Sequence, residues 1–348
     1  SNELDKGTTK NVFLKIKNSA PTTYAEGASI VDGATVGFTS GHLYFVNGQN
    51  QIYKYFTLSE DATDLENGKI KLSDITGAGV AFTEIPRAVV SIHVVGNCQA
   101  AGLPTTGAIT DVQNFVVKVE DQGDISAVNL YGSGGLVLRE GGAANEFTST
   151  ISLKPTVARI ELADITAGSN VTAFKVAGIF VDSYYPEAAV NGAVTAVSVE
   201  EISLAIGQYA DNSTKYPSRL NPAIYDWYSP EIEATGTPLL AKPTLAVWGY
   251  NVFATAAGST IPRIIIRLEN VKGTGDVDLG TRFLTIKGFT VDGTPLTALK
   301  AGEVYKIATG DLVFDEDDAT VVPNEDFIDV EVSVSLATWK VVNVKPEL

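Results

Sequence analysis

Alternating apolar and polar positions run along most of the chain and predict strands, with few helical patterns among them. In the first half this pattern places strands at 12–17, 41–47, 52–58, 88–95, 115–119 and 135–139. The 32 glycines mark most of the connections between strands. Asn47-Gly48 separates two of these strands and predicts a hairpin with a type I′ turn, because that turn needs two positive φ angles. Such a succession of short strands and turns is typical of an all-β protein.

A second set of strands begins after a polar connection, rich in Thr and Ser, that ends near Lys154-Pro155. These strands are predicted at 156–162, 172–181, 245–253, 262–268, 282–289 and 305–312. The stretch 184–243 is rich in Tyr, Asn, Pro and Ser, and we expect extended loops there with a short helix at 199–206. Many short strands in each half favour a β-sandwich, so we predict two sandwich domains, 1–154 and 155–348.

The first strand pattern lies close to the start of the chain. Within 11–17, Val12, Leu14 and Ile16 face one way and Phe13 faces the other. The stretch that follows, 18–36, is polar, contains small residues, Pro21 and Gly27, and is predicted to be a long loop.

The last segment, 327–348, is a strand pattern that continues almost to the final residue. Val330, Val332 and Val334 alternate with polar residues, which predicts the last strand of the second domain. After a break at 337–338, a second apolar run starts at Trp339. A strand that ends a chain presents unpaired N–H and C=O groups, so this run must pair within its own fold or join another molecule's sheet.

Composition narrows the functions open to such a chain. It has 348 residues, of which 45% are hydrophobic and 19% charged, and a net charge of −16. This charge repels nucleic-acid phosphates and anionic lipid headgroups, so we predict no nucleic-acid partner. No run of about 18 apolar residues occurs, which predicts no membrane-spanning helix. Methionine is absent, even at position 1, so we expect Ser1 to follow a removed leader or to be left by removal of a tag.

The residues that usually carry chemistry are scarce. Cys98 is the single cysteine and is expected to be a small buried apolar group. His42 and His93 are far apart in sequence, and each is expected to be a sheet residue. Neither a nucleophile with a base nor a metal cluster can be assembled from them, so we predict a protein that is not an enzyme and has no cofactor. The acidic runs 315–318 and 276–278 lack the Gly and terminal Glu of an EF-hand, and we interpret them as solvated loops.

An aromatic cluster is the exception. Tyr225, Trp227 and Tyr228 fall within the predicted loops of 184–243. Their rings offer a surface on which a sugar could stack, and they serve equally well as anchors for a loop.

Seven segments in a fixed order give the chain a family resemblance. It resembles the FimA-like and Mfa-like fimbrillins, the type V pilins of Bacteroidales, through 12–17 and its loop, 43–48, 86–92, 156–162, 301–307, 327–334 and 339–342. The resemblance implies two tandem transthyretin-like β-sandwich domains with a C-terminal strand extension, exported as an outer-membrane lipoprotein precursor. It further implies donor-strand exchange, in which a protease cuts the loop after the first strand and a neighbouring subunit's C-terminal strand fills the vacated groove.

This resemblance assigns roles to residues at both ends. The first strand that leaves the acceptor groove is represented by Val12, Phe13, Leu14 and Ile16. The donor strand lies within 337–348 and is represented by Trp339, Val341, Val342, Val344 and Leu348.

The processing region is Lys17, Thr23, Tyr24 and Ala25, and here the chain departs from the family pattern. The family has an arginine in the loop, whereas no Lys or Arg lies between Lys17 and Lys54. Three explanations stay open: a cut after Lys17, a protease of other specificity, or an anchor or tip subunit that keeps its first strand.

The function predicted from this resemblance is a structural subunit of a cell-surface fimbria that polymerises by strand exchange. Its partners would be other fimbrial subunits and a processing protease. The alternative is a non-polymerising anchor or tip adhesin, or a surface lipoprotein that binds a host glycan or protein through the aromatic loop.

Overall fold

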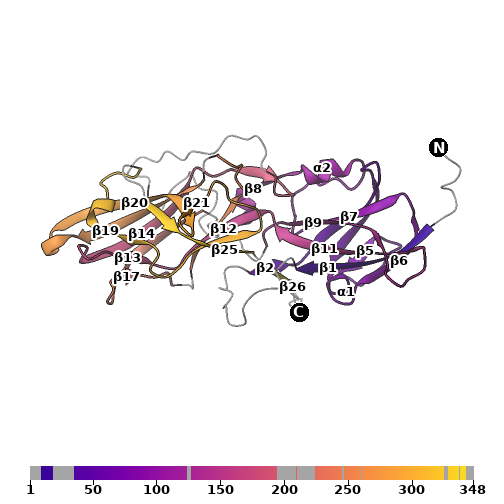
Figure 1. Cartoon of the computed structure of the whole chain (residues 1–348), viewed down its shortest axis with the longest axis horizontal. Helices are drawn as coiled ribbons and strands as arrows, with labels where there is room; N and C mark the ends of the chain where they lie inside the picture. The colour runs from indigo at the N-terminus through magenta and orange to yellow at the C-terminus, as the bar shows by residue number, and fades with distance from the viewer. Residues whose placement is uncertain are drawn as a thin grey trace.

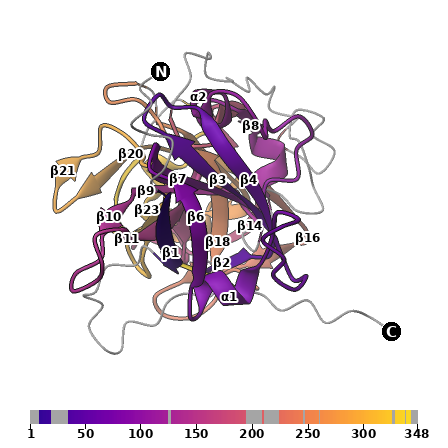
Figure 2. The same ribbon diagram turned by 90° about the vertical axis from the view of Figure 1, so that its right-hand side faces the viewer.

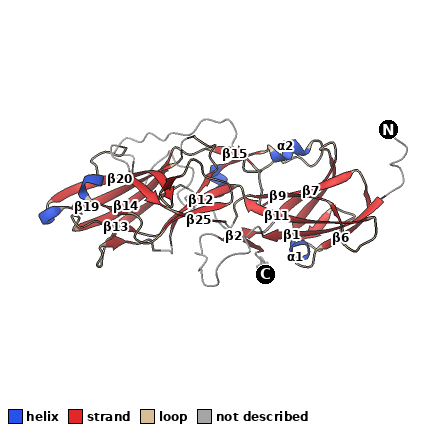
Figure 3. Cartoon of the chain, viewed as in Figure 1, coloured by secondary structure: helices blue, strands red, loops and turns tan. Residues whose placement is uncertain are grey.

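Strands make up most of the computed structural model, which confirms the all-β prediction (Figures 1 and 3). The structure describes residues 9–18, 35–123, 127–193, 209, 224–244, 247–259, 261–324, 328–336 and 338–341. The molecule is elongated: strands of 9–155 form one half and most strands from 157 onward form the other (Figure 1).

A nine-stranded sheet forms the N-terminal half. Its order is β5 (Lys69–Lys71), β4 (Ile52–Ser59), β3 (Gly41–Asn47), β7 (Val89–Gly96), β9 (Leu130–Gly135), β11 (Glu146–Pro155), β1 (Thr9–Asn18) and β6 (Val80–Pro86), with β10 (Val137–Leu138) also on β11. β11 bends between two layers, because its last residues pair with β9 and the rest of it pairs with β1. The layers face each other across an aromatic core, in which the ring of Phe82 on β6 lies 5.0 Å from that of Phe45 on β3.

Two larger sheets form the C-terminal half. One has the order β18 (Trp248–Phe253), β12 (Val157–Leu162), β22 (Glu303–Ile307) and β25 (Ser333–Leu336). The other has the order β16 (Tyr225–Glu233), β14 (Ala173–Asp182), β19 (Arg263–Lys272), β20 (Asp278–Val291) and β21 (Thr294–Pro295), with β24 (Ile328–Glu331) also on β20. A small sheet of β17 (Leu240–Ala241), β13 (Ile165–Ala167) and β23 (Val313–Phe314) completes this half.

Helices are short. They are α1 (Leu72–Thr76), α2 (Ile109–Gln113), and the 3₁₀ turns η3 (Val119–Gln122), η5 (Thr274–Asp276) and η6 (Glu316–Asp318). None of the described helices is long and apolar enough to cross a membrane.

Two ladders in the described part of the chain join the halves. β8 (Val116–Lys118) pairs antiparallel with β15 (Glu187–Ala189), and β2 (Thr35–Phe38) pairs parallel with β26 (Thr338–Val341). A buried chain of amides adds to them. The Asn251 amide donates to the Gln122 carbonyl at 2.7 Å, the Gln122 amide donates to Asn129 Oδ1 at 2.8 Å, and Asn129 donates to the Asn97 carbonyl at 2.9 Å. These polar groups are satisfied within the joint, which fixes the halves to each other.

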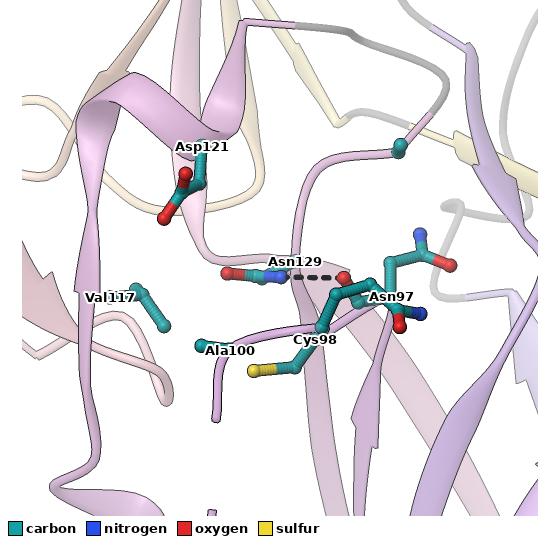
Figure 4. Close-up of a pocket in the computed structure, with 8 residues that line it drawn as sticks. Asn97, Cys98, Ala100, Val117, Asp121 and Asn129 are labelled. Carbon is teal, nitrogen blue, oxygen red and sulfur yellow. Dashed lines mark hydrogen bonds between the residues drawn. The ribbon is translucent and has the colours of Figure 1, made fainter. Parts of the chain in front are cut away.

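Next to this joint is a cavity of about 330 Å³, lined by Asn97, Cys98, Val117, Asp121 and Asn129 among others (Figure 4). Cys98 is buried, as predicted, and burial raises the pKa of its thiol. A thiol held neutral in this way behaves as a packing group rather than a nucleophile.

Several local predictions need correction. β3 and β4 do form a hairpin, but its turn runs from Asn47 to Gln51 and has its positive φ at Asn50, so it is not a two-residue type I′ turn. The prediction of a polar connection before Lys154 is wrong, because these residues form β11. The prediction of a loop at 225–228 is also wrong, because these residues form the start of β16. The helix predicted at 199–206 lies outside the described residues.

The last strand prediction also changes in detail. Val330 and Val332 are buried as predicted, whereas Val334 is exposed. The reason is that the segment divides into β24, which joins the sheet of β20, and β25, which joins the sheet of β22.

Candidate functional site

The first strand lies inside its sheet rather than at an edge. β1 runs parallel to β11 on one side, with Val12 opposite Phe147, and antiparallel to β6 on the other, with Val12 opposite Phe82 (Figure 2). Val12, Leu14 and Ile16 are 1%, 0% and 1% exposed, as the alternation predicts. Removing β1 would therefore open two ladder edges and an apolar trench between them.

Phe13 points to the other face of β1 and is 39% exposed. Its ring covers Gly79, which lies just before β6. A Cβ at Gly79 would come within 2.3 Å of the Phe13 ring, and the φ angle of +95° at this position also favours glycine. Gly79 thus lets the Phe13 ring lie against the backbone.

Lys10 is the polar member of the buried face, and sequence reasoning missed it. Its side chain is 4% exposed, and its ammonium donates to the main-chain carbonyls of Arg87 at 3.2 Å and of Val89. The ammonium also lies 4.5 Å from the centre of the Phe147 ring, a cation–π distance. Burial, together with the positive charge of Arg87, lowers the pKa of Lys10. The available signal was its position two residues before Val12, in phase with the buried residues.

The backbone of β1 alternates between its two neighbours. The N–H of Asn11 donates to the Asn145 carbonyl on the β11 side at 2.9 Å. Successive N–H groups of a strand point to opposite sides, so the N–H of Ile16 points to the β6 side. β6 begins at Val80, opposite Leu14, and Ile16 therefore lies beyond the end of the β1–β6 ladder.

The C-terminal strand β26 pairs with β2 of the same chain, with Trp339 opposite Val36 and Val341 opposite Phe38. It also lies next to β1 and α1 (Figure 1). The segment thus changes partner at the predicted break, from the C-terminal half at Leu336 to the N-terminal half at Thr338. Val342, Val344 and Leu348, also predicted as donor residues, lie outside the described residues.

β2, the strand that pairs with β26, is held in place by burial and by side-chain hydrogen bonds. Val36 and Phe38 are fully buried. The side-chain amide of Asn97 donates to the Gly37 carbonyl at 2.6 Å, and its oxygen accepts from the Thr39 N–H at 3.0 Å. Because Asn97 also belongs to the amide chain of the joint, the strand that receives the tail is connected to the contact between the halves.

Of the predicted processing residues, Lys17 is described. It is exposed and lies at the end of β1 opposite Ser152, beyond the β6 ladder. Thr23, Tyr24 and Ala25 lie outside the described residues. Within the described residues, the peptide bond after Lys17 is therefore bordered by β11 but lies beyond the end of the β6 ladder.

The aromatic cluster belongs to β16 rather than to a loop. Tyr225 is buried, and Trp227 and Tyr228 are half-buried. The Tyr228 hydroxyl accepts from the Trp248 indole N–H at 2.7 Å, and the Arg267 guanidinium lies 5.4 Å from the Trp227 ring centre. These contacts are those of packed anchors, one of the two interpretations of the sequence.

Histidines and acidic residues occupy structural positions. His42 lies on β3, and His93 lies on β7 with its Nδ1 2.7 Å from the Tyr131 hydroxyl, as expected of sheet residues. Asp315 and Asp318 cap η6 reciprocally. In the described part of the chain, no three His, Cys, Asp or Glu side chains are grouped to hold a metal ion.

Comparison with known proteins identifies this architecture. No family model and no curated protein matches the chain. Among solved structures, a fimbrilin (FimA) from Porphyromonas gingivalis W83 superposes with a TM-score of 0.55 at 12% identity, covering 96% of this chain and 98% of that one. A Bacteroides eggerthii protein, named for a suspected role in cell adhesion, gives a TM-score of 0.55 at 14% identity and covers 97% of this chain and 98% of that one.

At such low identity these matches establish the fold. The chain has the fold of the fimbrilins over nearly its whole length, and the resemblance inferred from sequence is confirmed at that level.

Proposed function

We propose that this chain is a structural subunit of a cell-surface fimbria and joins other subunits by donor-strand exchange. β1 leaves its place between β11 and β6, and the C-terminal strand of a neighbouring subunit takes it. The subunit comprises two sandwich domains, 1–154 and 155–348, and is exported as an outer-membrane lipoprotein precursor. The observation that carries the proposal is the central position of β1 with its fully buried face.

The energetics of the vacated groove favour strand capture. Val12, Leu14 and Ile16 each contribute about 1.5 to 3 kcal/mol by burial, or roughly 4.5 to 9 kcal/mol together. A vacated groove would also leave the ladder groups of β11 and β6 without partners, which adds to the cost. An incoming strand that restores both terms forms a durable junction. Head-to-tail contacts of this kind do not close on themselves, so they generate a filament.

Release of β1 requires a cut in or near the segment that follows it. Lys17 is exposed and no other Lys or Arg follows it before Lys54, so a trypsin-like protease that cuts after Lys17 would separate nearly all of β1. Cleavage near Tyr24 by a protease of other specificity would likewise separate β1 from the rest of the chain. The lack of Lys and Arg between Lys17 and Lys54 also supports a second candidate, an anchor or tip subunit that keeps β1 and only donates its tail.

Controlled proteolysis tests the proposal. The full chain is treated with trypsin, the loss of 1–17 is followed by mass spectrometry, and assembly is followed as ladders that resist SDS without boiling. We expect ladders whose length grows with protein concentration and that disappear when 339–348 are deleted. Lys17→Gln is the matched control and should keep both β1 and the monomeric state. Chains that lose 1–17, keep 339–348 by mass spectrometry and stay monomeric would contradict polymerisation.

A further inference from the structure

The place of β1 makes a specific demand on any strand that replaces it. At the position of Lys10 the two carbonyls of Arg87 and Val89 need a donor, and the Phe147 ring favours a cation. The next three inward positions, those of Val12, Leu14 and Ile16, are apolar and closed to water. The groove therefore fits a strand with a lysine at one inward position and apolar residues at the next three inward positions.

The tail of this chain carries that pattern. Lys340, Val342, Val344 and Pro346 repeat the spacing of Lys10, Val12, Leu14 and Ile16, and Lys345 falls where β1 has Lys15.

We propose that the partner is a second copy of this chain, whose tail enters the groove in the same direction as β1 with Lys340 in the place of Lys10. This inference rests on the proposed strand exchange and specifies its register. Val342 then lies opposite Phe82 and Phe147, and Val344 opposite Val80 and Ser149, as Val12 and Leu14 do in the monomer. Asn343, Lys345 and Glu347 face outward, where Phe13, Lys15 and Lys17 lie.

Pro346 supports this register independently. Proline has no N–H, so it is excluded wherever the ladder needs a donor. In the place of Ile16 its nitrogen faces the β6 side, beyond the end of the β6 ladder at Val80. The proline therefore removes no hydrogen bond of the β6 ladder at this position.

Other registers fit worse. A shift of two residues one way puts Pro346 in the place of Leu14, inside the β6 ladder, and leaves the carbonyl pair without an ammonium. A shift the other way buries Lys340 in the apolar place of Val12. The opposite face of the tail buries Asn343, and the opposite direction puts Pro346 or Asn343 among the apolar places. Each alternative leaves a buried polar group without a hydrogen-bond partner or removes a hydrogen bond of the ladder.

This register has a consequence for the monomer. Lys340 and Val341 belong to β26, where they pair with Gly37 and Phe38 of β2. Their backbone cannot occupy β2 and a neighbour's groove at once, so in this register a tail that is donated must first leave β2.

Disulfide trapping tests the register. Phe13 and Ala81 are cross-strand neighbours, and Ala81 is exposed, so Asn343 in the place of Phe13 would face Ala81 of the next copy. The full chain carries Ala81→Cys with Asn343→Cys, and Cys98→Ser removes the native thiol. The matched controls replace Asn343→Cys with Val341→Cys or Lys345→Cys, which report shifts of two residues. After trypsin treatment and oxidation, boiled samples are compared with and without reductant.

The register predicts boiling-resistant, reductant-sensitive ladders for the 81/343 pair and at least about tenfold fewer for the control pairs. Ladders that assemble but cross-link at a control pair, or not at 81/343, would overturn the register and leave strand exchange standing. Failure of the cysteine-free chain to assemble after losing β1 would refute strand exchange itself, and the register with it.

A second measurement tests the lysine site. Lys340→Met keeps the length of the side chain and removes the donor, so ladders should dissociate about tenfold faster or more on heating. Lys345→Met, which changes an outward lysine, should leave the dissociation rate unchanged. Equal rates for both variants would contradict the placement of Lys340 on the Arg87 and Val89 carbonyls.

Discussion

Truncating one buried side chain of β1 separates the role of this strand in the monomer from its role in assembly. Leu14 is fully buried between Val80 on β6 and Ser149 on β11. Leu14→Ala removes its burial and leaves a cavity, and such changes cost about 2 to 5 kcal/mol. That loss is a large share of the roughly 4.5 to 9 kcal/mol contributed by the three apolar side chains that hold β1.

This loss acts on the monomer and not on the polymer. Once β1 has been cut and has left, the groove of the variant is identical to that of the wild type. At the lower bound of about 2 kcal/mol, the population of the strand-released state rises about 30-fold. We therefore expect faster assembly after proteolysis, with ladders that dissociate at the wild-type temperature.

Two assays measure these effects. Urea unfolding of the uncut chain gives the free energy of unfolding, and the time course of SDS-resistant ladders after trypsin treatment gives the assembly rate. Leu138→Ala is the matched control, because Leu138 lies on β10 beside β11 and is 60% exposed, so its loss should change the free energy of unfolding by less than about 0.5 kcal/mol. Unchanged unfolding of Leu14→Ala, or ladders of lower stability, would refute this account of β1.

Three further predictions concern other buried groups. Burial lowers the pKa of His93 to about 4. As the pH falls, the unfolded chain therefore takes up this proton first, so the contribution of His93 to stability is complete above pH 6.5 and is lost between pH 6.5 and about 4. Urea unfolding should show a smaller loss over this range in His93→Gln than in the wild type, and part of the loss should remain because burial also lowers the pKa of His42. Cys98 should react with Ellman's reagent at least about a hundredfold more slowly in the native chain than in denaturant, and equal rates would contradict its burial. Glu161 is paired with Arg159 at 3.0 Å with side-chain exposures of 1% and 10%, so Glu161→Gln should lower the free energy of unfolding by about 3 kcal/mol, whereas Glu120→Gln in the exposed pair with Lys118 should change it by less than about 1 kcal/mol.

The strands that sequence predicts well are those rich in apolar residues at regular positions. β1 and β12 alternate Val, Leu, Ile or Ala with other residues, while β3 and β4 are rich in aromatic and aliphatic residues, and the predicted limits of all four lie within a few residues of the observed ones. The two neighbours of β1 are missed. In β11 the outward positions hold Thr and Ser. The apolar pattern of Phe147, Ile151 and Leu153 is therefore interrupted by residues that also favour turns. Ser and Thr belong there because that face meets solvent, which the local sequence does not reveal.

β16 is missed for a different reason. Pro230 lies within it, and a proline inside a run argues against a central strand. In the described part of its sheet, β16 occupies the end of the strand order, next to β14 alone. At such an edge a missing N–H costs nothing, so the position of the strand in the sheet decides whether the proline is tolerated. That position depends on residues far away in the sequence.

The tail shows why hydrophobicity alone cannot assign a donor face. Trp339 and Val341 make one face apolar, while Val342, Val344 and Leu348 make the other apolar, so burial energy favours neither by much. The choice between them falls to the few polar demands of the groove. Two carbonyls beside Lys10 require a donor, and the β6 ladder, which ends at Val80, decides where a proline fits. These demands favour the face of Lys340 and Val342. They can be recognised only from the structure, which shows which strands and which carbonyl groups border β1.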